Sequence, residues 1–286
     1  MILVTGATGQ LGTLVIRHLL NKTPANQIAG LARDENKAAD LKAKGIDIRI
    51  GNYDDTQSLE RAMQGIDRVL LIAGTDEDNR VRQHQNVVDA AKKVGVRCIA
   101  YTSRTLKDRS TMVNQLMLGH FQTEDLIRAS GLKHIIFRNV LYMDAIPQFV
   151  GEQVFSGGIA LPVGTGKLPF ALRQDMAEGI ANVMLEGACD DRTYTFTGRE
   201  AYTFGDVANV LSKLSGQKVE FAALETSAFE AQLKARGVPE VVARRIVGFM
   251  TDIKNGQEDE ISVDLEDALG RKPATLEEGL KVLFKL

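Results

Sequence analysis

The sequence ILVTGATGQLG, residues 2–12, joins an apolar strand-like run to an amphipathic helix pattern through a glycine-rich turn. A tight strand-to-helix turn points several backbone N–H groups and the positive end of the helix dipole at one spot, which suits a pyrophosphate. Gly6 is expected to form the turn, Gly9 to admit the phosphate, and Gly12 to let the helix approach the strand. An ordinary glycine-rich turn is the alternative interpretation. The predicted cofactor contacts in this stretch are Gly6, Thr8, Gly9, Gln10, Leu11 and Gly12.

Short apolar runs alternate with helical patterns through the first half of the chain. This alternation predicts an α/β fold of Rossmann type, a doubly wound parallel sheet. Ligands of such sheets bind outside the carboxyl ends of the strands, so the residues that follow each strand are candidates for a site. The predicted strands are residues 2–4, 28–32, 47–50, 69–73, 99–102 and 135–138.

After Asn139 the pattern changes to stretches punctuated by Pro and Gly and mixed with helices. We therefore expect an NAD(P)-binding domain over residues 1–140 and a smaller C-terminal substrate-binding lobe over residues 141–286. The β-like run 193–197 is predicted to return to the main sheet as a seventh strand. Helices are predicted around residues 58–63, 176–185, 204–214 and 241–253.

Bulk composition is that of an ordinary globular chain, with 286 residues, 44% hydrophobic residues and a formal net charge of -2. No charge run indicates nucleic acid as a partner, and no apolar stretch approaches the ~20 residues of a membrane span. We expect a cytoplasmic protein without a metal site, and a homodimer is among the states that the sequence allows. Cys98 and Cys189 show no motif spacing and are expected to be inert.

The second predicted strand ends in Leu31-Ala32-Arg33-Asp34. An arginine at this position can pair with the 2′-phosphate of an adenosine ribose, whereas an acid there accepts from the ribose hydroxyls. Arg33 therefore predicts NADP(H) as the cofactor. Asp34 beside it leaves the ribose interpretation open, and both residues could be solvated loop charges.

Two further strands end in candidate cofactor contacts. Asn52, after the third strand, is placed to accept from the adenine amine, although a helix-initiating turn explains it as well. Ala73 and Gly74 follow the fourth strand, where small residues would let a ribose or nicotinamide lie close to the backbone.

Taken together, these motifs resemble the NmrA-like atypical short-chain dehydrogenases/reductases, and the wide GxxGxxG spacing is typical of that superfamily. The resemblance runs nearly from end to end. It rests on VTGATGQLG at residues 4–12, Arg33, QHQN at 83–86, AYTS at 100–103, HFQTE at 120–124, FRNVLY at 137–142, and the tail segments 262–269 and 275–280.

The resemblance also exposes a departure. Ordinary members of the superfamily reduce carbonyls with a Tyr-xxx-Lys pair, in which the phenol protonates the developing alkoxide. The equivalent stretch here is Leu116-Met117-Leu118-Gly119-His120, without the tyrosine and with His120 at the lysine position. A ketone is therefore disfavoured. A quinone gives a far less basic anion, and a carbocationic dye needs no proton, so both acceptors fit the loss of the acid.

The resemblance implies roles for residues after the fifth and sixth strands. Tyr101, Thr102 and Ser103 would hold the nicotinamide carboxamide or the substrate, and His120 the nicotinamide ribose; His120 is also the one candidate catalytic residue. Asn139 and Tyr142 would line the substrate pocket. A purely structural histidine and a core tyrosine are the alternatives. Asn86, a proton-relay residue in relatives, is expected to be structural here. Phe149, Phe155 and Phe170 would line an apolar pocket or fill the core.

The sequence therefore predicts an NADPH-dependent oxidoreductase that transfers hydride to a quinone or a similar planar, electron-poor aromatic molecule. The first alternative is a non-catalytic NAD(P)-binding redox sensor of the NmrA type, which the missing Tyr/Lys pair motivates. The second, a nucleotide-sugar epimerase, ranks last because it needs the absent tyrosine.

Overall fold

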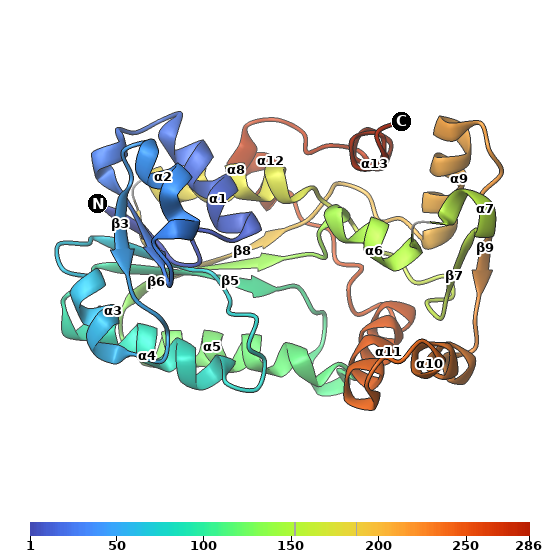
Figure 1. Ribbon diagram of the computed structural model, residues 1–286, viewed down its shortest axis with the longest axis horizontal. Helices are drawn as coiled ribbons and strands as arrows, with labels where there is room; N and C mark the ends of the chain where they lie inside the picture. The colour runs from blue at the N-terminus through green and yellow to red at the C-terminus, as the bar shows by residue number, and fades with distance from the viewer. Residues whose placement is uncertain (152, 187) are drawn as a thin grey trace.

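The computed structural model describes residues 1–151, 153–186 and 188–286, with residue 116 described by its backbone alone. Its central sheet has seven parallel strands in the order β3-β2-β1-β4-β5-β6-β8 (Figure 1). The order reverses between β1 and β4, which is where ligands bind in doubly wound sheets. The predicted Rossmann-type fold is confirmed. The strands are β1 (Ile2–Val4), β2 (Ile28–Ala32), β3 (Asp47–Ile50), β4 (Arg68–Leu71), β5 (Cys98–Arg104), β6 (Lys133–Asn139) and β8 (Arg192–Phe196).

Helices cover both faces of this sheet (Figure 1). One layer is α1 (Gln10–Leu20), α2 (Ala39–Ala43), α8 (Arg173–Leu185) and α12 (Asp264–Leu269); the other is α3 (Thr56–Ala62), α4 (Arg80–Lys93) and α5 (Leu118–Ala129). Successive side chains of β1 pack alternately against the two helix layers. Leu3 packs with Leu59 on the α3 side, whereas Val4 packs with Val15 on the α1 side. Both faces are buried, as a parallel sheet requires.

The second lobe has its own hydrophobic core, which includes Phe170, Phe204 and Met250. Its small sheet pairs β7 (Ile159–Leu161) with β9 (Phe221–Ala223) in parallel. The helices of this lobe are α6 (Ile146–Val150), α7 (Val154–Gly157), α9 (Phe204–Ser215), α10 (Thr226–Ala235), α11 (Glu240–Lys254) and α13 (Leu276–Phe284). Short 3-10 turns are η1 (Ala25–Gln27), η2 (Asn36–Ala38), η3 (Arg109–Thr111), η4 (Gln115–Met117) and η5 (Met143–Ala145).

Parts of the second half of the chain lie on the main sheet. The β8 strand pairs in parallel with β6, so that Phe137 lies opposite Tyr194. The α8 helix packs against α1, and α12 packs against α8 and β8. The run 193–197 thus overlaps a strand of the main sheet, while the boundary at residue 140 stays a prediction.

Local sequence signals explain several helix ends. Asp55 caps α3, because its Oδ1 accepts the backbone N–H of Ser58 at 3.0 Å. After α3 the chain turns at Gly65 with φ +72°, a left-handed conformation that favours glycine.

The expectation that both cysteines are inert is wrong, because Cys98 and Cys189 form a disulfide with their Cα atoms 6.0 Å apart. The bond joins the first residue of β5 to the loop after α8. The two residues are 91 positions apart, so sequence spacing could not predict the pairing. Among the described residues, no helix has both the length and the apolar character that a membrane crossing requires.

Candidate functional site at the carboxyl edge of the sheet

The glycine-rich turn between β1 and α1 has the geometry that its sequence predicts. Gly6 adopts φ +58°, and the N–H of Gly9 donates to its carbonyl at 2.9 Å. A Cβ on Gly12 would lie 2.3 Å from the Gly6 carbonyl oxygen, so only glycine fits there. No side chain caps the first turn of α1. The turn therefore presents uncapped N–H groups at the start of an 11-residue helix, which suits an anion.

The two charged residues after β2 are engaged differently. Asp34 Oδ1 accepts the backbone N–H of Asn36 at 2.9 Å and so closes the turn into η2. Arg33 is exposed, and no hydrogen bond or ion pair of its guanidinium occurs among the described residues. Arg33 is thus available to an external anion, while Asp34 already has a structural role.

Asn52 and Asn86 both serve the loop that leads into α3. Asn52 Oδ1 accepts the backbone N–H groups of Asp54 at 2.8 Å and Asp55 at 3.0 Å, which is the helix-initiating turn. Asn86 Nδ2 donates to the Tyr53 carbonyl at 2.8 Å. The structural role expected for Asn86 is therefore confirmed, and a contact of Asn52 with adenine stays a prediction.

The backbone after β4 is held by buried side chains. The N–H of Ala73 donates to Thr102 Oγ1 at 3.0 Å, and the N–H of Gly74 donates to His84 Nε2 at 3.1 Å. A Cβ on Gly74 would meet no heavy atom of another residue closer than 3.5 Å. A Cβ there would make ordinary contacts with Gln83, His84 and Tyr53, so the protein itself does not require glycine at this position. A contact of Ala73 or Gly74 with a cofactor stays a prediction.

The three hydroxyl groups in the second half of β5, which extends to Arg104, all have protein partners. Tyr101 is fully buried, and its hydroxyl lies 2.9 Å from His120 Nδ1. Thr102 accepts from Ala73, and Ser103 Oγ donates to Glu124 Oε1 at 2.6 Å. Direct contacts of these side chains with a nicotinamide stay a prediction.

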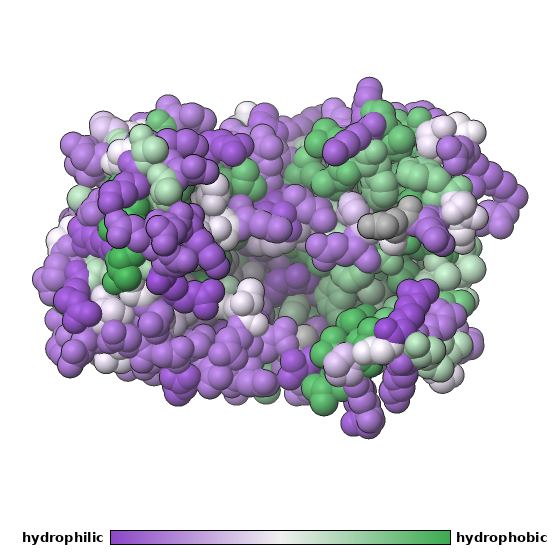
Figure 2. Space-filling view, in the orientation of Figure 1, coloured by the Kyte–Doolittle hydropathy of each residue, from purple (hydrophilic) through white to green (hydrophobic). Residues whose placement is uncertain are grey.

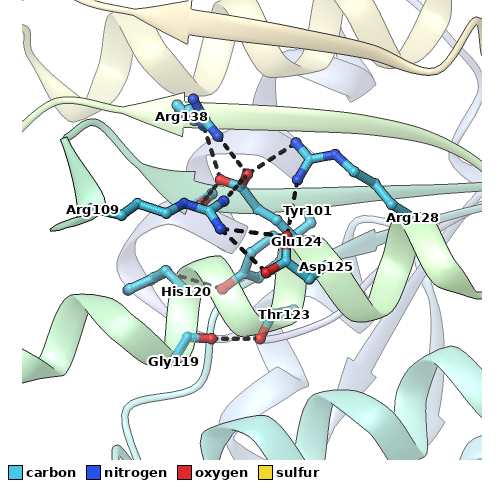
Figure 3. A network of polar contacts seen from close by, with 10 residues as sticks. Tyr101, Arg109, Gly119, His120, Thr123, Glu124, Asp125, Arg128 and Arg138 are labelled. Atoms are coloured by element: carbon cyan, nitrogen blue, oxygen red, sulfur yellow. Dashed lines mark hydrogen bonds and ion pairs between the residues drawn. The ribbon is translucent and has the colours of Figure 1, made fainter. Parts of the chain in front are cut away.

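A buried carboxylate anchors α5 to the sheet (Figure 3). The Glu124 side chain is fully buried and accepts from Ser103, Arg128 and Arg138, with Arg109 at 3.2 Å. Burial opposes its ionisation, but the hydrogen bonds from Arg138 and Ser103 outweigh burial and hold the pKa of Glu124 below its usual range. This network fixes the helix that carries His120.

His120 is a neutral imidazole. Burial, and then the cations Arg80 and Arg104, hold the pKa of His120 well below its usual range. Burial raises the pKa of Tyr101, so its phenol keeps its proton. His120 stands at the lysine position of ordinary relatives but cannot supply a positive charge there at neutral pH.

His120 lines a cavity of about 550 Å³ between the main sheet and the second lobe. In Figure 2 this face is hollowed between its two halves, and hydrophobic residues gather on the second-lobe side. Phe149 from α6 stacks on Phe249 from α11, with ring centroids 6.0 Å apart. The lining residues are Thr75, Glu77, Arg80, Arg104, Asn114, Met117, His120, Leu141, Phe149, Val242, Arg245, Ile246 and Phe249.

Sequence reasoning missed the arginines of this cavity. Arg104, the last residue of β5, pairs with buried Glu258 at 3.2 Å, lies over Phe249, and has a buried Nε without a partner. Arg245 on α11 pairs with Glu77 at 3.0 Å and so joins the second lobe to the loop after β4. The position of Arg104 at the carboxyl end of β5 was the signal that could have identified it.

Asn139 and Tyr142 are not among the described lining residues of this cavity. Asn139 is buried at the end of β6, with its Oδ1 unpartnered and its Nδ2 3.4 Å from the Tyr142 hydroxyl. Tyr142 packs on the main core under the guanidinium of Arg173. Their role in substrate binding stays a prediction. Phe149 lines the cavity, whereas Phe170 is a core residue.

A parallel sheet with a glycine turn at its switch point and a cavity at its carboxyl edge defines a Rossmann-type dinucleotide-binding protein. The chain belongs to the NmrA-like family, whose model matches residues 1–280. The predicted family resemblance is confirmed.

Individual relatives match over the whole chain. Quinone oxidoreductase 2 of Escherichia coli (strain K12) is 35% identical over 290 residues, covering 100% of this chain and 99% of that protein. The solved structure of the E. coli NADPH-dependent quinone oxidoreductase QOR2 complexed with NADPH superposes with a TM-score of 0.94 at 34% identity, over 99% of this chain and 100% of that one. Triphenylmethane reductase of Citrobacter sp., complexed with NADP(H), gives a TM-score of 0.91 at 34% identity, over the same 99% and 100%.

Proposed function

We propose that this chain is an NADPH-dependent reductase that transfers hydride to a quinone. One observation carries the proposal: the cavity at the carboxyl edge has no tyrosine or lysine among its described lining residues, and its histidine is neutral. Such a site offers no strong acid to an alkoxide. It suits an acceptor whose reduced form is a weakly basic anion.

NADPH, when bound, supplies the hydride. On this proposal the glycine turn binds its pyrophosphate, and Arg33 pairs with the 2′-phosphate because Asp34 is engaged in the η2 turn. Gly74, without a side chain, would let the nicotinamide end lie close to the backbone after β4. Two of the similar structures described above were solved in complex with NADPH or NADP(H), which supports this cofactor.

The acceptor side of the cavity suits a flat ring. Phe149, Phe249 and Leu141 supply apolar surface, and stacking on aromatic side chains is favourable for planar molecules. Arg104 and Arg80 add positive charge on the same lining, where it would stabilise the hydroquinone anion. The quinone gains hydride from NADPH and a proton from water, so the products are hydroquinone and NADP⁺.

Steady-state oxidation of NADPH by the purified protein tests this proposal. We expect turnover with a panel of quinones, and less with NADH than with NADPH. If the protein bound NADPH tightly but oxidised none of it with quinones or triphenylmethane dyes, the proposed enzymatic function would be wrong and a redox sensor would be favoured.

A further inference from the structure

The hydrogen bond between Tyr101 and His120 determines which nitrogen of the imidazole carries the proton. The Tyr101 hydroxyl is buried, with His120 Nδ1 at 2.9 Å and Thr123 as a second side-chain hydrogen-bond partner. A buried phenol that keeps its proton needs an acceptor, and an unprotonated ring nitrogen is one. Thr123 Oγ1 is already engaged with His84 Nδ1 and with the Gly119 carbonyl, so we infer that Nδ1 of His120 accepts from the phenol.

The other nitrogen then carries the hydrogen. A neutral imidazole has one N–H, so acceptance at Nδ1 places that hydrogen on Nε2. His120 lines the cavity, and no partner of its Nε2 occurs among the described residues. The ring thus offers a neutral N–H donor to whatever occupies the cavity.

The same argument assigns the opposite tautomer to His84, which lies on the neighbouring helix α4. Its Nε2 accepts the N–H of Gly74 at 3.1 Å, so its Nδ1 carries the hydrogen and donates to Thr123 Oγ1 at 2.9 Å. Thr123 in turn donates to the Gly119 carbonyl at 2.8 Å (Figure 3). The two buried histidines therefore adopt opposite tautomers, each fixed by its neighbour.

We propose that Tyr101 is a positioning residue that fixes His120 as the Nε2–H tautomer, and that this N–H is the donor for the oxygen of the acceptor. The inference rests on the proposed function. As hydride adds to a quinone, negative charge develops on the ring oxygen, and Nε2–H stabilises it by a hydrogen bond without giving up its proton. The hydroquinone anion later takes a proton from water.

The Nε2–H donor of His120 should affect the reduction of quinones and of cationic dyes differently. A quinone has an oxygen on which charge develops, whereas the carbocation of a triphenylmethane dye accumulates no negative charge when hydride arrives. Loss of the N–H donor should therefore slow quinone reduction by a much larger factor than dye reduction.

Nitrogen-15 NMR of the histidine side chains tests the tautomers in the protein without cofactor at neutral pH. His120→Gln assigns the signals of His120. We expect Nε2 of His120 to be protonated and its Nδ1 not, with the reverse pattern for His84. Tyr101→Phe should change the His120 pattern, and Tyr53→Phe, another buried tyrosine with a bonded hydroxyl, should not. A protonated Nδ1 on His120 in the wild-type protein would overturn the inference.

Kinetics of Tyr101→Phe test the role. We expect kcat with a quinone to fall on the order of 10- to 100-fold, and kcat for a cationic dye to fall by a much smaller factor. An equal loss with both acceptors, or weaker NADPH binding that accounts for the loss, would overturn it. If NMR shows the predicted tautomers but the protein reduces no quinone, the proposed function is wrong, and so is the assignment of Nε2–H as the donor to the acceptor oxygen. The opposite tautomers in an active quinone reductase would overturn this inference alone.

Discussion

Glu124 Oε2 lies 2.7 Å from Arg138 Nη2, in a pair whose carboxylate is fully buried between α5 and the sheet (Figure 3). Ser103 donates to the other oxygen, and Arg109 and Arg128 approach the carboxylate from the surface. A buried carboxylate without these partners would be strongly destabilising. The network therefore holds α5, and with it His120, in one position against β5.

Glu124→Gln should destabilise the protein by about 3 kcal/mol, because it leaves arginines near the sheet without their shared carboxylate. Chemical denaturation measures the change. Asp125→Asn is the matched control, since Asp125 is the next residue, pairs with Arg109 and Arg128, and is 63% exposed. The control should change stability by less than about 1 kcal/mol, and equal losses in both variants would contradict the anchoring role of Glu124.

Stability should fall as the pH decreases below about 6.5, through His84. Burial, with Arg80 as the second cause, lowers the pKa of His84 to about 3 in the folded protein, so the unfolded chain binds a proton first. Each pH unit between the two values then costs up to about 1.4 kcal/mol. Denaturation of wild type and His84→Gln between pH 7.5 and pH 4.5 checks this, and the variant should show a shallower slope below pH 6.5 only. Parallel slopes over the whole range would show that His84 does not titrate as a buried neutral group.

Arg33→Ala should weaken NADPH binding by ~1–3 kcal/mol, the value of a charge-assisted pair, and spare NADH. Calorimetric titration with both cofactors measures the difference. Asp34→Ala is the control in the adjacent position, and it should leave the preference for NADPH intact because Asp34 closes a turn. An equal loss for both cofactors in Arg33→Ala would refute the phosphate contact.

Gly74→Ala should separate folding from cofactor binding. A Cβ at Gly74 would make ordinary contacts with Gln83, His84 and Tyr53 at 3.5 to 3.7 Å, so the variant should keep most of its stability. Its NADPH affinity should fall, because on the proposed function the nicotinamide lies against this backbone. Gly12→Ala should instead destabilise the fold, because its Cβ would lie 2.3 Å from the Gly6 carbonyl oxygen. Thermal denaturation and NADPH titration of both variants distinguish the two effects, and unchanged affinity in Gly74→Ala would place the nicotinamide elsewhere.

The sequence predicted the main sheet well because parallel strands are continuous apolar runs separated by helices with clear ends. The predicted strand 28–32 matches β2, and the others lie within a few residues of their observed ends. The small sheet of β7 and β9 was missed, since each strand has only three residues, too few to show a periodicity, and Phe221–Ala223 is also largely exposed.

Only those site residues that belong to one local sequence motif were predicted. Gly6 and Arg33 come within two residues of the ends of β1 and β2, and Gly12 lies in the first turn of α1, so their neighbours in sequence are also their neighbours in space. Arg245 and Phe249 reach the cavity because α11 of the second lobe packs over the edge of the sheet, and no local pattern encodes that contact. The Cys98–Cys189 bond was missed for the same reason.

The central claim is that this edge of the sheet holds NADPH and passes its hydride to a quinone without a tyrosine acid. Rapid mixing of the preformed protein–NADPH complex with a quinone tests it, with NADPH deuterated at C4 of the nicotinamide as the comparison. We predict a single-turnover loss of nicotinamide absorbance that is slower with the deuterated cofactor. Bound NADPH that persists unchanged in the presence of every quinone offered would contradict the account.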